Sequence, residues 1–166
     1  MRFLDQEEVK ILISKTLGAD GRPSVPGPAQ QGKRVAFEAD PGYSYYARAK
    51  EVLEALGYFD WCVLWVVLTE VWPSNENLHL YYRLRQAYGD LEYVDRKPAL
   101  MALRHESADL LSFLHLGMLF GWEMYLVTSH DEGRAFVSHD GWFEVSTQAL
   151  DGATPGPQNE NSGPAT

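Results

Sequence analysis

The chain has 166 residues, of which 45% are hydrophobic and 13% aromatic, and this composition supports one domain with a sizeable core. Its formal net charge of −9 argues against the clustered basic surface on which binding to nucleic acids or anionic membranes rests. Cys62 is the only cysteine, which excludes an internal disulfide and any metal site made of several cysteines.

The chain is expected to lie in the cytoplasm, away from membranes. Its first ten residues, MRFLDQEEVK, carry acidic side chains where a signal peptide needs an apolar core. The longest unbroken apolar run, WCVLWVVL, has eight residues, whereas a helix that spans a bilayer needs about 20. We therefore expect a soluble cytoplasmic protein with no membrane partner.

The amino-terminal part predicts a helix, a loop and a strand. Asp5 and Glu8 have the spacing of a capping box, which predicts a helix over residues 6–17. Residues 18–32 are rich in proline and glycine and predict a loop. The sequence VAFEA, residues 35–39, predicts a strand.

The middle of the chain predicts a second helix and a buried strand. Asp40 followed by proline is a helix-start signal, and the apolar stripe after it ends at a glycine. Residues 61–72 are apolar on both alternating faces, which favours a central strand in a sheet covered on both sides. Near the end of this strand, Glu70 is expected to emerge into solvent or to pair with Arg83 or Arg85.

The second half predicts two more helices and four strands. Helices are expected at about 76–88 and 107–120, and strands at 99–103 and near 122–129, 134–139 and 142–147. From residue 150 onwards the chain has no residue suited to a core, which predicts a disordered tail. We therefore predict one globular domain over residues 1–149 and a disordered tail over residues 150–166.

The order of these elements predicts an α+β fold. Helices alternate with the strands near 61–72, 99–103 and 122–129, which suggests right-handed crossover connections. The last three strands are separated by short turns, which favours an antiparallel meander. We therefore predict a mixed sheet that ends in a three-stranded antiparallel meander, with about four helices packed on it.

The tripeptide Ser-His-Asp occurs twice, at 129–131 and 138–140, and its residue types are those of a hydrolase triad or a metal site. The two copies are expected at opposite ends of one strand, too far apart to share a metal ion. One copy alone cannot form a triad, because consecutive strand residues point to opposite faces. Since Ser and Asp side chains bond nearby backbone, we interpret both copies as turns.

Two further motifs lack what their chemistry requires. The stretch GPAQQGKR, residues 27–34, has arginine where a phosphate-binding loop needs Ser or Thr, and it leads into a strand. The stretch HESAD, residues 105–109, has aspartate in place of the second histidine of a zinc motif, and its helix is expected to begin only at Ser107. Accordingly, we predict no cofactor, no metal ion and no catalytic residue.

The predicted hairpin turns at 132–133 and 140–141 set the register of the meander. In this register His130 lies opposite Ala135 and His139 lies opposite Trp142. One face, expected to meet the core, carries Tyr125, Val127, Phe136, Phe143 and Val145. The other face carries Thr128, His130, His139, Trp142, Glu144 and Ser146.

A tryptophan among polar groups on an outer face needs a cover, which is either a helix of the same chain or a partner. Under the partner interpretation the candidate binding residues are His139, Asp140, Trp142 and Glu144, with Trp142 as the anchor and the carboxylates facing a basic surface.

The sequence favours a non-catalytic, acidic protein-binding module that neutralises a basic partner, as immunity proteins and antitoxins do. The alternative is a small hydrolase or metal-dependent enzyme that uses His105, Glu106, His130 or His139. A third interpretation is a pocket for a small ligand beside helix 107–120. The identity of the partner and the oligomeric state stay open.

Overall fold

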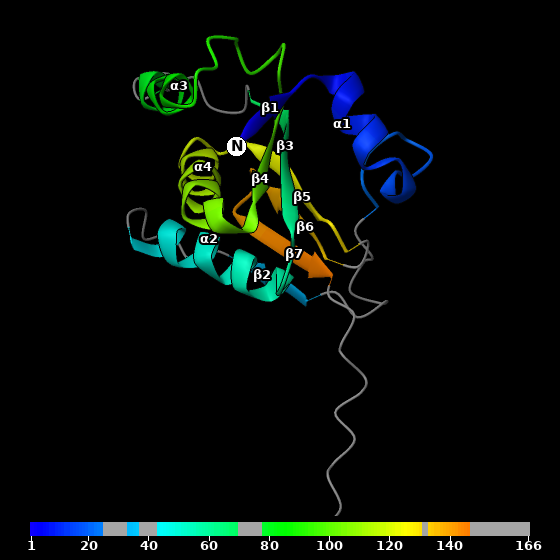
Figure 1. Ribbon diagram of the computed structural model, residues 1–166. Coiled ribbons are helices and arrows are strands. Elements are labelled where there is room, and N and C mark those ends of the chain that lie inside the picture. Colours follow the sequence, from blue (N-terminus) through cyan, green and yellow to red (C-terminus); the bar gives the residue numbers. More distant parts are fainter. Residues whose placement is uncertain (25–32, 37–42, 70–77, 131–132, 147–166) are drawn as a thin grey trace, which may run out of the picture.

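The computed structural model describes residues 1–24, 33–36, 43–69, 78–130 and 133–146, and the side chains of these residues except 33–36, 43 and 44. These residues form one seven-stranded sheet with helices on both faces (Figure 1). Several predicted features lie outside the described residues. They are the helix start at Asp40, the residues 70–77 that include Glu70, the first residue of the turn expected at 132–133 and the tail over 150–166.

The predicted capping box is confirmed. Helix α1 spans Gln6–Leu12, and the Asp5 carboxylate accepts hydrogen bonds from the backbone N–H groups of Glu7 and Glu8 at 2.9 and 2.8 Å. In return the Glu8 carboxylate accepts from the Asp5 N–H at 3.0 Å. A 3₁₀ turn follows at Ser14–Thr16. The strand β1, Arg2–Leu4, had no signal of its own in the sequence.

The other predicted elements overlap the expected ranges, with three main differences in bounds. The helix expected over 6–17 ends at Leu12, the strand expected over 61–72 ends at Leu68, and residues 37–39 of the strand expected over 35–39 lie outside the described residues. The helices are α2 (Tyr43–Leu56), α3 (Leu78–Ala87) and α4 (Ser107–Leu119). The strands are β2 (Lys33–Ala36), β3 (Trp61–Leu68), β4 (Ala99–Leu103), β5 (Glu123–Thr128), β6 (Arg134–Ser138) and β7 (Trp142–Ser146). Gly57, Gly89 and Gly121 follow the three helices with positive φ, a conformation that glycine adopts without strain.

The α+β class and the carboxyl-terminal meander are confirmed, whereas the expected parallel pairing is not. The strand order is β1-β4-β3-β5-β6-β7-β2, and every pair of neighbouring strands is antiparallel. The crossover through α4 joins β4 to β5, which run in the same direction. However, β3 lies between them and is antiparallel to both, so no parallel ladder forms.

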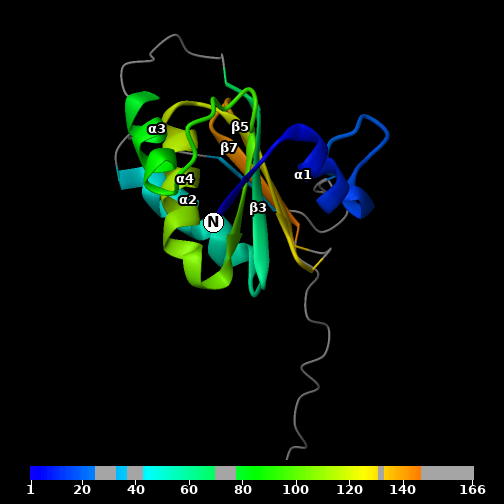
Figure 2. The ribbon, with the colours of Figure 1, turned by 45° about the horizontal axis from the view of Figure 1, so that its top comes forward.

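The sheet separates two cores, which confirms that β3 is covered on both faces. On one face α2, α3 and α4 pack over a large core that includes Leu64, Met124 and Val137. On the other face α1 covers a smaller core around Val63 and Trp65. Figure 2 shows α1 on one side of the sheet and the other three helices on the opposite side.

The predicted register of the meander is wrong at both turns. In β5 and β6, Val127 lies opposite Arg134 and Leu126 opposite Ala135, so the first turn is longer than two residues. In β6 and β7, Ser138 lies opposite Trp142, which leaves a three-residue loop with Gly141 at φ 79°. A shift of one residue in pairing turns a whole strand over. Consequently Phe143 and Val145 face the large core, and Trp142 and Glu144 share the opposite face with Tyr125 and Phe136.

Cys62 lies in the large core, as its apolar neighbours indicated. Its thiol is fully buried, and burial raises its pKa to about 12, which suppresses the reactive thiolate near neutral pH. Native protein at pH 8 is therefore expected not to react with Ellman's reagent, and guanidinium-denatured protein should release one equivalent of the chromophore. Rapid labelling of the native protein would contradict this placement of Cys62.

Candidate protein-binding surface

Three aromatic side chains form a continuous row across β5, β6 and β7. The ring centroids of Tyr125 and Phe136 are 4.8 Å apart, and those of Phe136 and Trp142 are 5.3 Å apart. All three rings are half-buried and lie on the sheet face that α1 covers elsewhere, opposite α2, α3 and α4. We call these three residues the aromatic row.

Acidic groups and a histidine border the row where β6 turns into β7. The Nδ1 atom of His139 lies 2.7 Å from a carboxylate oxygen of Glu123, and its Nε2 atom lies 3.2 Å from a carboxylate oxygen of Asp140. The side chain of Asp140 is 68% exposed, whereas that of Glu123 is 17% exposed. The histidine therefore bridges a partly covered carboxylate and one that faces solvent.

Glu144 is the most buried acidic residue of this face. It is only 9% exposed, and among the described side chains its Oε1 atom has no hydrogen-bond partner. Its cross-strand neighbours are Phe136 in β6 and Arg34 in β2. A buried carboxylate is costly unless a donor or a cation meets it, so this position favours a positive group nearby.

The loop before residue 25 borders the other end of the row. Arg134 donates hydrogen bonds from Nη1 to the carbonyl and hydroxyl oxygens of Ser24, at 2.8 and 3.1 Å. Burial raises the pKa of Tyr125, and Arg22 lies close enough to oppose that effect. The row is therefore framed on one side by a loop that carries both Asp20 and Arg22, and on the other by Glu123 and Asp140.

The structure brings the predicted binding residues together but changes their roles. His139 and Asp140 form the turn, Trp142 packs against Phe136, and Glu144 is buried beneath the surface instead of lying at its rim. Sequence reasoning missed Glu123 and assigned Tyr125 and Phe136 to the core side. The missed signal was Gly141, because a positive φ at the third loop residue is typical of a three-residue hairpin.

The two Ser-His-Asp copies lie apart, as expected from the sequence; His139 and Asp140 of the second copy form a turn, whereas Asp131 of the first copy lies outside the described residues. In the first, Ser129 Oγ accepts a hydrogen bond from the Asp60 N–H at 2.9 Å, and His130 Nε2 is 4.0 Å from the Asp60 carboxylate. In the second, Ser138 Oγ accepts from the Asp140 N–H at 3.1 Å. The two histidines lie at opposite ends of β5, beside Asp60 and Glu123 respectively.

The HESAD stretch, residues 105–109, leads into the start of helix α4. Residues Arg104–Glu106 form a 3₁₀ turn before α4, and a Glu106 carboxylate oxygen accepts a hydrogen bond from the Leu103 N–H at 2.8 Å. The other oxygen contacts the amino group of Met1, and both interactions lower the pKa of Glu106. This carboxylate is therefore occupied in holding the turn and the strand β1.

Comparisons with known proteins add no functional information. No protein-family model, curated protein or solved structure matches the chain. Within the described ranges, no group of three or more His, Cys, Asp or Glu residues is arranged to hold a metal ion. In the same ranges, no helix has the length and apolar character needed to cross a bilayer.

Proposed function

We propose that the chain is a non-catalytic protein-binding module that binds a basic partner through the aromatic row. The observation that carries the proposal is the position of Tyr125, Phe136 and Trp142 in one half-exposed row bordered by carboxylates. Tyrosine and tryptophan are enriched among the residues that dominate binding energy at interfaces. The acidic border and the net charge of −9 favour a partner with a positive surface.

More specifically, we propose that the chain neutralises the activity of its basic partner. A small acidic protein that covers the active surface of a basic partner would block that partner in the manner of an immunity protein or an antitoxin. A reduced, buried Cys62 fits a cytoplasmic location for this role.

The enzymatic alternative has weaker support. A serine nucleophile needs a histidine base within hydrogen-bond reach, with a third group to orient that base. The Ser129 hydroxyl oxygen instead accepts a hydrogen bond from the backbone N–H of Asp60, and the Ser138 hydroxyl oxygen accepts one from the backbone N–H of Asp140 in its own turn. The Glu106 carboxylate accepts one from the Leu103 N–H at the entry to α4.

A phage-displayed random peptide library, selected on the immobilised full chain, tests the proposal without a known partner. Peptides that combine Arg or Lys with apolar residues are expected to be enriched. Trp142→Ala should weaken the best peptide by about 2 kcal/mol or more, which is roughly 30-fold, because the variant removes the anchor of the row. Asp140→Asn keeps the size of an exposed side chain and is expected to weaken binding mainly at low salt.

Tyr93→Ala is the matched control, because Tyr93 is a 65% exposed aromatic residue in a different part of the molecule. It should bind the selected peptide like the unmodified chain. The melting temperature of each variant shows whether a loss of binding reflects unfolding. Enrichment of acidic peptides, or equal binding by the Trp142→Ala and Tyr93→Ala variants, would refute the proposal.

A further inference from the structure

A shallow groove lies between α2 and α4, on the face of the sheet opposite the aromatic row. This groove has a volume of about 490 Å³, within the size range of sites for small ligands. Its lining includes the buried or half-buried apolar residues Leu53, Phe59 and Leu111 and the exposed residues Lys50, Glu54, Tyr58 and Arg104. We call it the Tyr58 groove. It lies beside α4, where the sequence suggested a pocket.

The mouth of the groove carries a guanidinium stacked on an aromatic ring. The Cζ atom of Arg104 lies 3.9 Å from the centroid of the Tyr58 ring, and the backbone N–H of Arg104 donates a 3.0 Å hydrogen bond to the backbone carbonyl oxygen of Asp60. The Tyr58 hydroxyl donates to the Asp60 carboxylate at 3.3 Å. The stacked ring therefore orders Arg104, and among the described residues no carboxylate forms an ion pair with its guanidinium.

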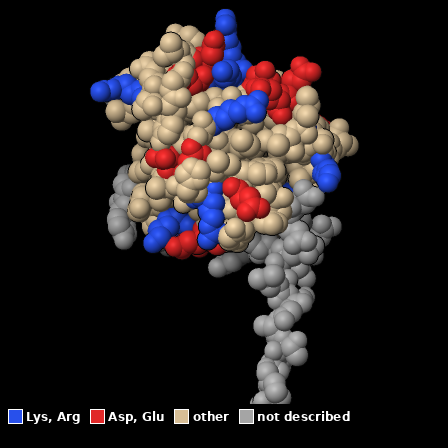
Figure 3. Space-filling model, in the orientation of Figure 1, with Lys and Arg blue, Asp and Glu red and all other residues tan. Residues whose placement is uncertain are grey.

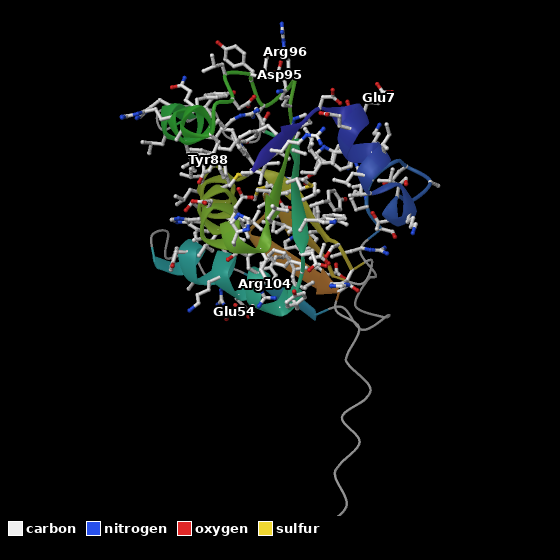
Figure 4. The ribbon with its side chains drawn as sticks, viewed as in Figure 1. Glu7, Glu54, Tyr88, Asp95, Arg96 and Arg104 are labelled. Carbon is white, nitrogen blue, oxygen red and sulfur yellow. The ribbon has the colours of Figure 1, made fainter. Side chains whose placement is uncertain are left out.

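The local charge of the groove is opposite to that of the whole chain. Lys50 lies 3.6 Å from the carboxylate of Glu54, so these two charges compensate each other. Arg104 adds a further positive charge to the lining itself, while the Asp60 carboxylate lies outside the lining on the hydroxyl of Tyr58; the chain as a whole carries −9. Figure 4 places Arg104 and Glu54 at the same end of the molecule, and Figure 3 shows basic and acidic side chains interspersed with uncharged surface on this side. The groove is thus suited to a ligand that joins an apolar part to an anion.

We propose that the Tyr58 groove binds the carboxyl-terminal end of a partner polypeptide whose last side chain is apolar. The side chain would enter the apolar lining, and the terminal carboxylate would meet the planar fork of Arg104 in a charge-assisted, bidentate contact. This site is independent of the aromatic row and of the proposed function.

The surroundings of the groove favour the end of a chain over a free carboxylic acid. The rings of Tyr58 and His130 lie 6.1 Å apart, and both residues are more than half exposed beyond the mouth. They offer contact area for the residues that precede the carboxyl terminus. Capture of terminal carboxylates by positioned donors is a recurring mode of peptide recognition.

Titration of the isotope-labelled full chain, followed by two-dimensional NMR, tests this proposal with three probes. The probes are an acetylated Ala-Ala-Ala-Leu peptide with a free carboxyl terminus, the same peptide as its carboxamide, and N-acetyl-leucine. Shifts around Tyr58, Arg104 and Leu111 are expected with the free-acid peptide. The affinity of the carboxamide should be lower by a factor of about ten or more, because it loses the charge-assisted contact.

Arg104→Gln should reduce binding of the free-acid peptide to that of the carboxamide. Arg96→Gln is the matched control, because Arg96 is 74% exposed in a distant segment, and it should leave binding unchanged. The chemical-shift spectrum of each variant reports its folding directly. Equal binding of acid and carboxamide, no binding of either peptide at millimolar concentration, or equally strong binding of N-acetyl-leucine would each overturn the proposal. The last outcome would assign the groove to small carboxylic acids.

Discussion

Replacing Asp90 with alanine is expected to lower the free energy of unfolding by about 3–5 kcal/mol, because it leaves a buried guanidinium without its counter-ion. Arg85 is fully buried, and Asp90 is 8% exposed. The Arg85 Nε–H donates to a carboxylate oxygen of Asp90 at 2.7 Å, and Nη1 donates to the carbonyl oxygen of Lys97 at 3.1 Å. The Arg85 guanidinium also lies 4.4 Å from the centroid of the Phe3 ring. Urea denaturation of the purified variant measures the loss.

Glu92→Ala is the control for this experiment, because Glu92 forms an ion pair with Arg96 in the same irregular segment but at the surface. Exposed pairs of this kind contribute roughly 0–1 kcal/mol, so this variant should be close to the unmodified chain. The double variant Arg85→Met, Asp90→Leu should recover part of the stability, since it removes both charges together. A loss below about 1 kcal/mol for Asp90→Ala would contradict a buried, paired Asp90.

Phe113→Ala is expected to destabilise the protein by a similar amount, about 3–5 kcal/mol, through the cavity that it leaves. Phe113 is fully buried on α4, and its ring lies 5.7 Å from that of Phe3, 5.5 Å from that of Tyr81 and 6.2 Å from that of Tyr88. This aromatic cluster joins strand β1 and helices α3 and α4, so its loss loosens three elements at once. Thermal and urea denaturation, each monitored by near-UV circular dichroism, measure the loss of stability.

The control for Phe113 lies on the same helix. Leu119 is 43% exposed, and Leu119→Ala should change the stability by about 0.5 kcal/mol, because alanine is a good helix former and the site is partly in solvent. Phe113→Leu should cost less than Phe113→Ala, because it keeps most of the buried volume. If Phe113→Ala and Leu119→Ala had equal effects, the core would not lie where the structure places it.

The structure also explains why the arrangement of the candidate binding residues was only partly predictable. His139, Asp140, Trp142 and Glu144 are close in sequence, so any hairpin brings them near one another. Which of them lie on the face of Phe136 depends on whether the loop that ends at Gly141 has two residues or three. The three-residue loop moves Trp142 to the face of Phe136 and buries Glu144 to 9% exposure. The Tyr58 groove had less signal still, because its lining comes from α2, α4 and the turns after α2 and β4.

The pairing of Arg85 shows the same dependence on the tertiary structure. The sequence offered Glu70 as one partner of Arg85, and Glu70 lies outside the described residues. The structure pairs Arg85 with Asp90, which lies in the irregular segment after α3. No periodicity marks such a contact, because it depends on how the segment folds back towards Phe3 and the core.

The sequence by itself determined most of the described elements, β1 excepted, and the α+β class. The capping box at Asp5 and Glu8, the glycines after the helices and the β-branched content of β3 act within a few residues, so they can be read locally. Only the tertiary structure decided the antiparallel order of the sheet, the addition of β1 beside β4 and the face that each strand of the meander turns outward. The reason is that strand pairing joins residues far apart in the chain, and a change of one residue in register reverses every side chain of a strand.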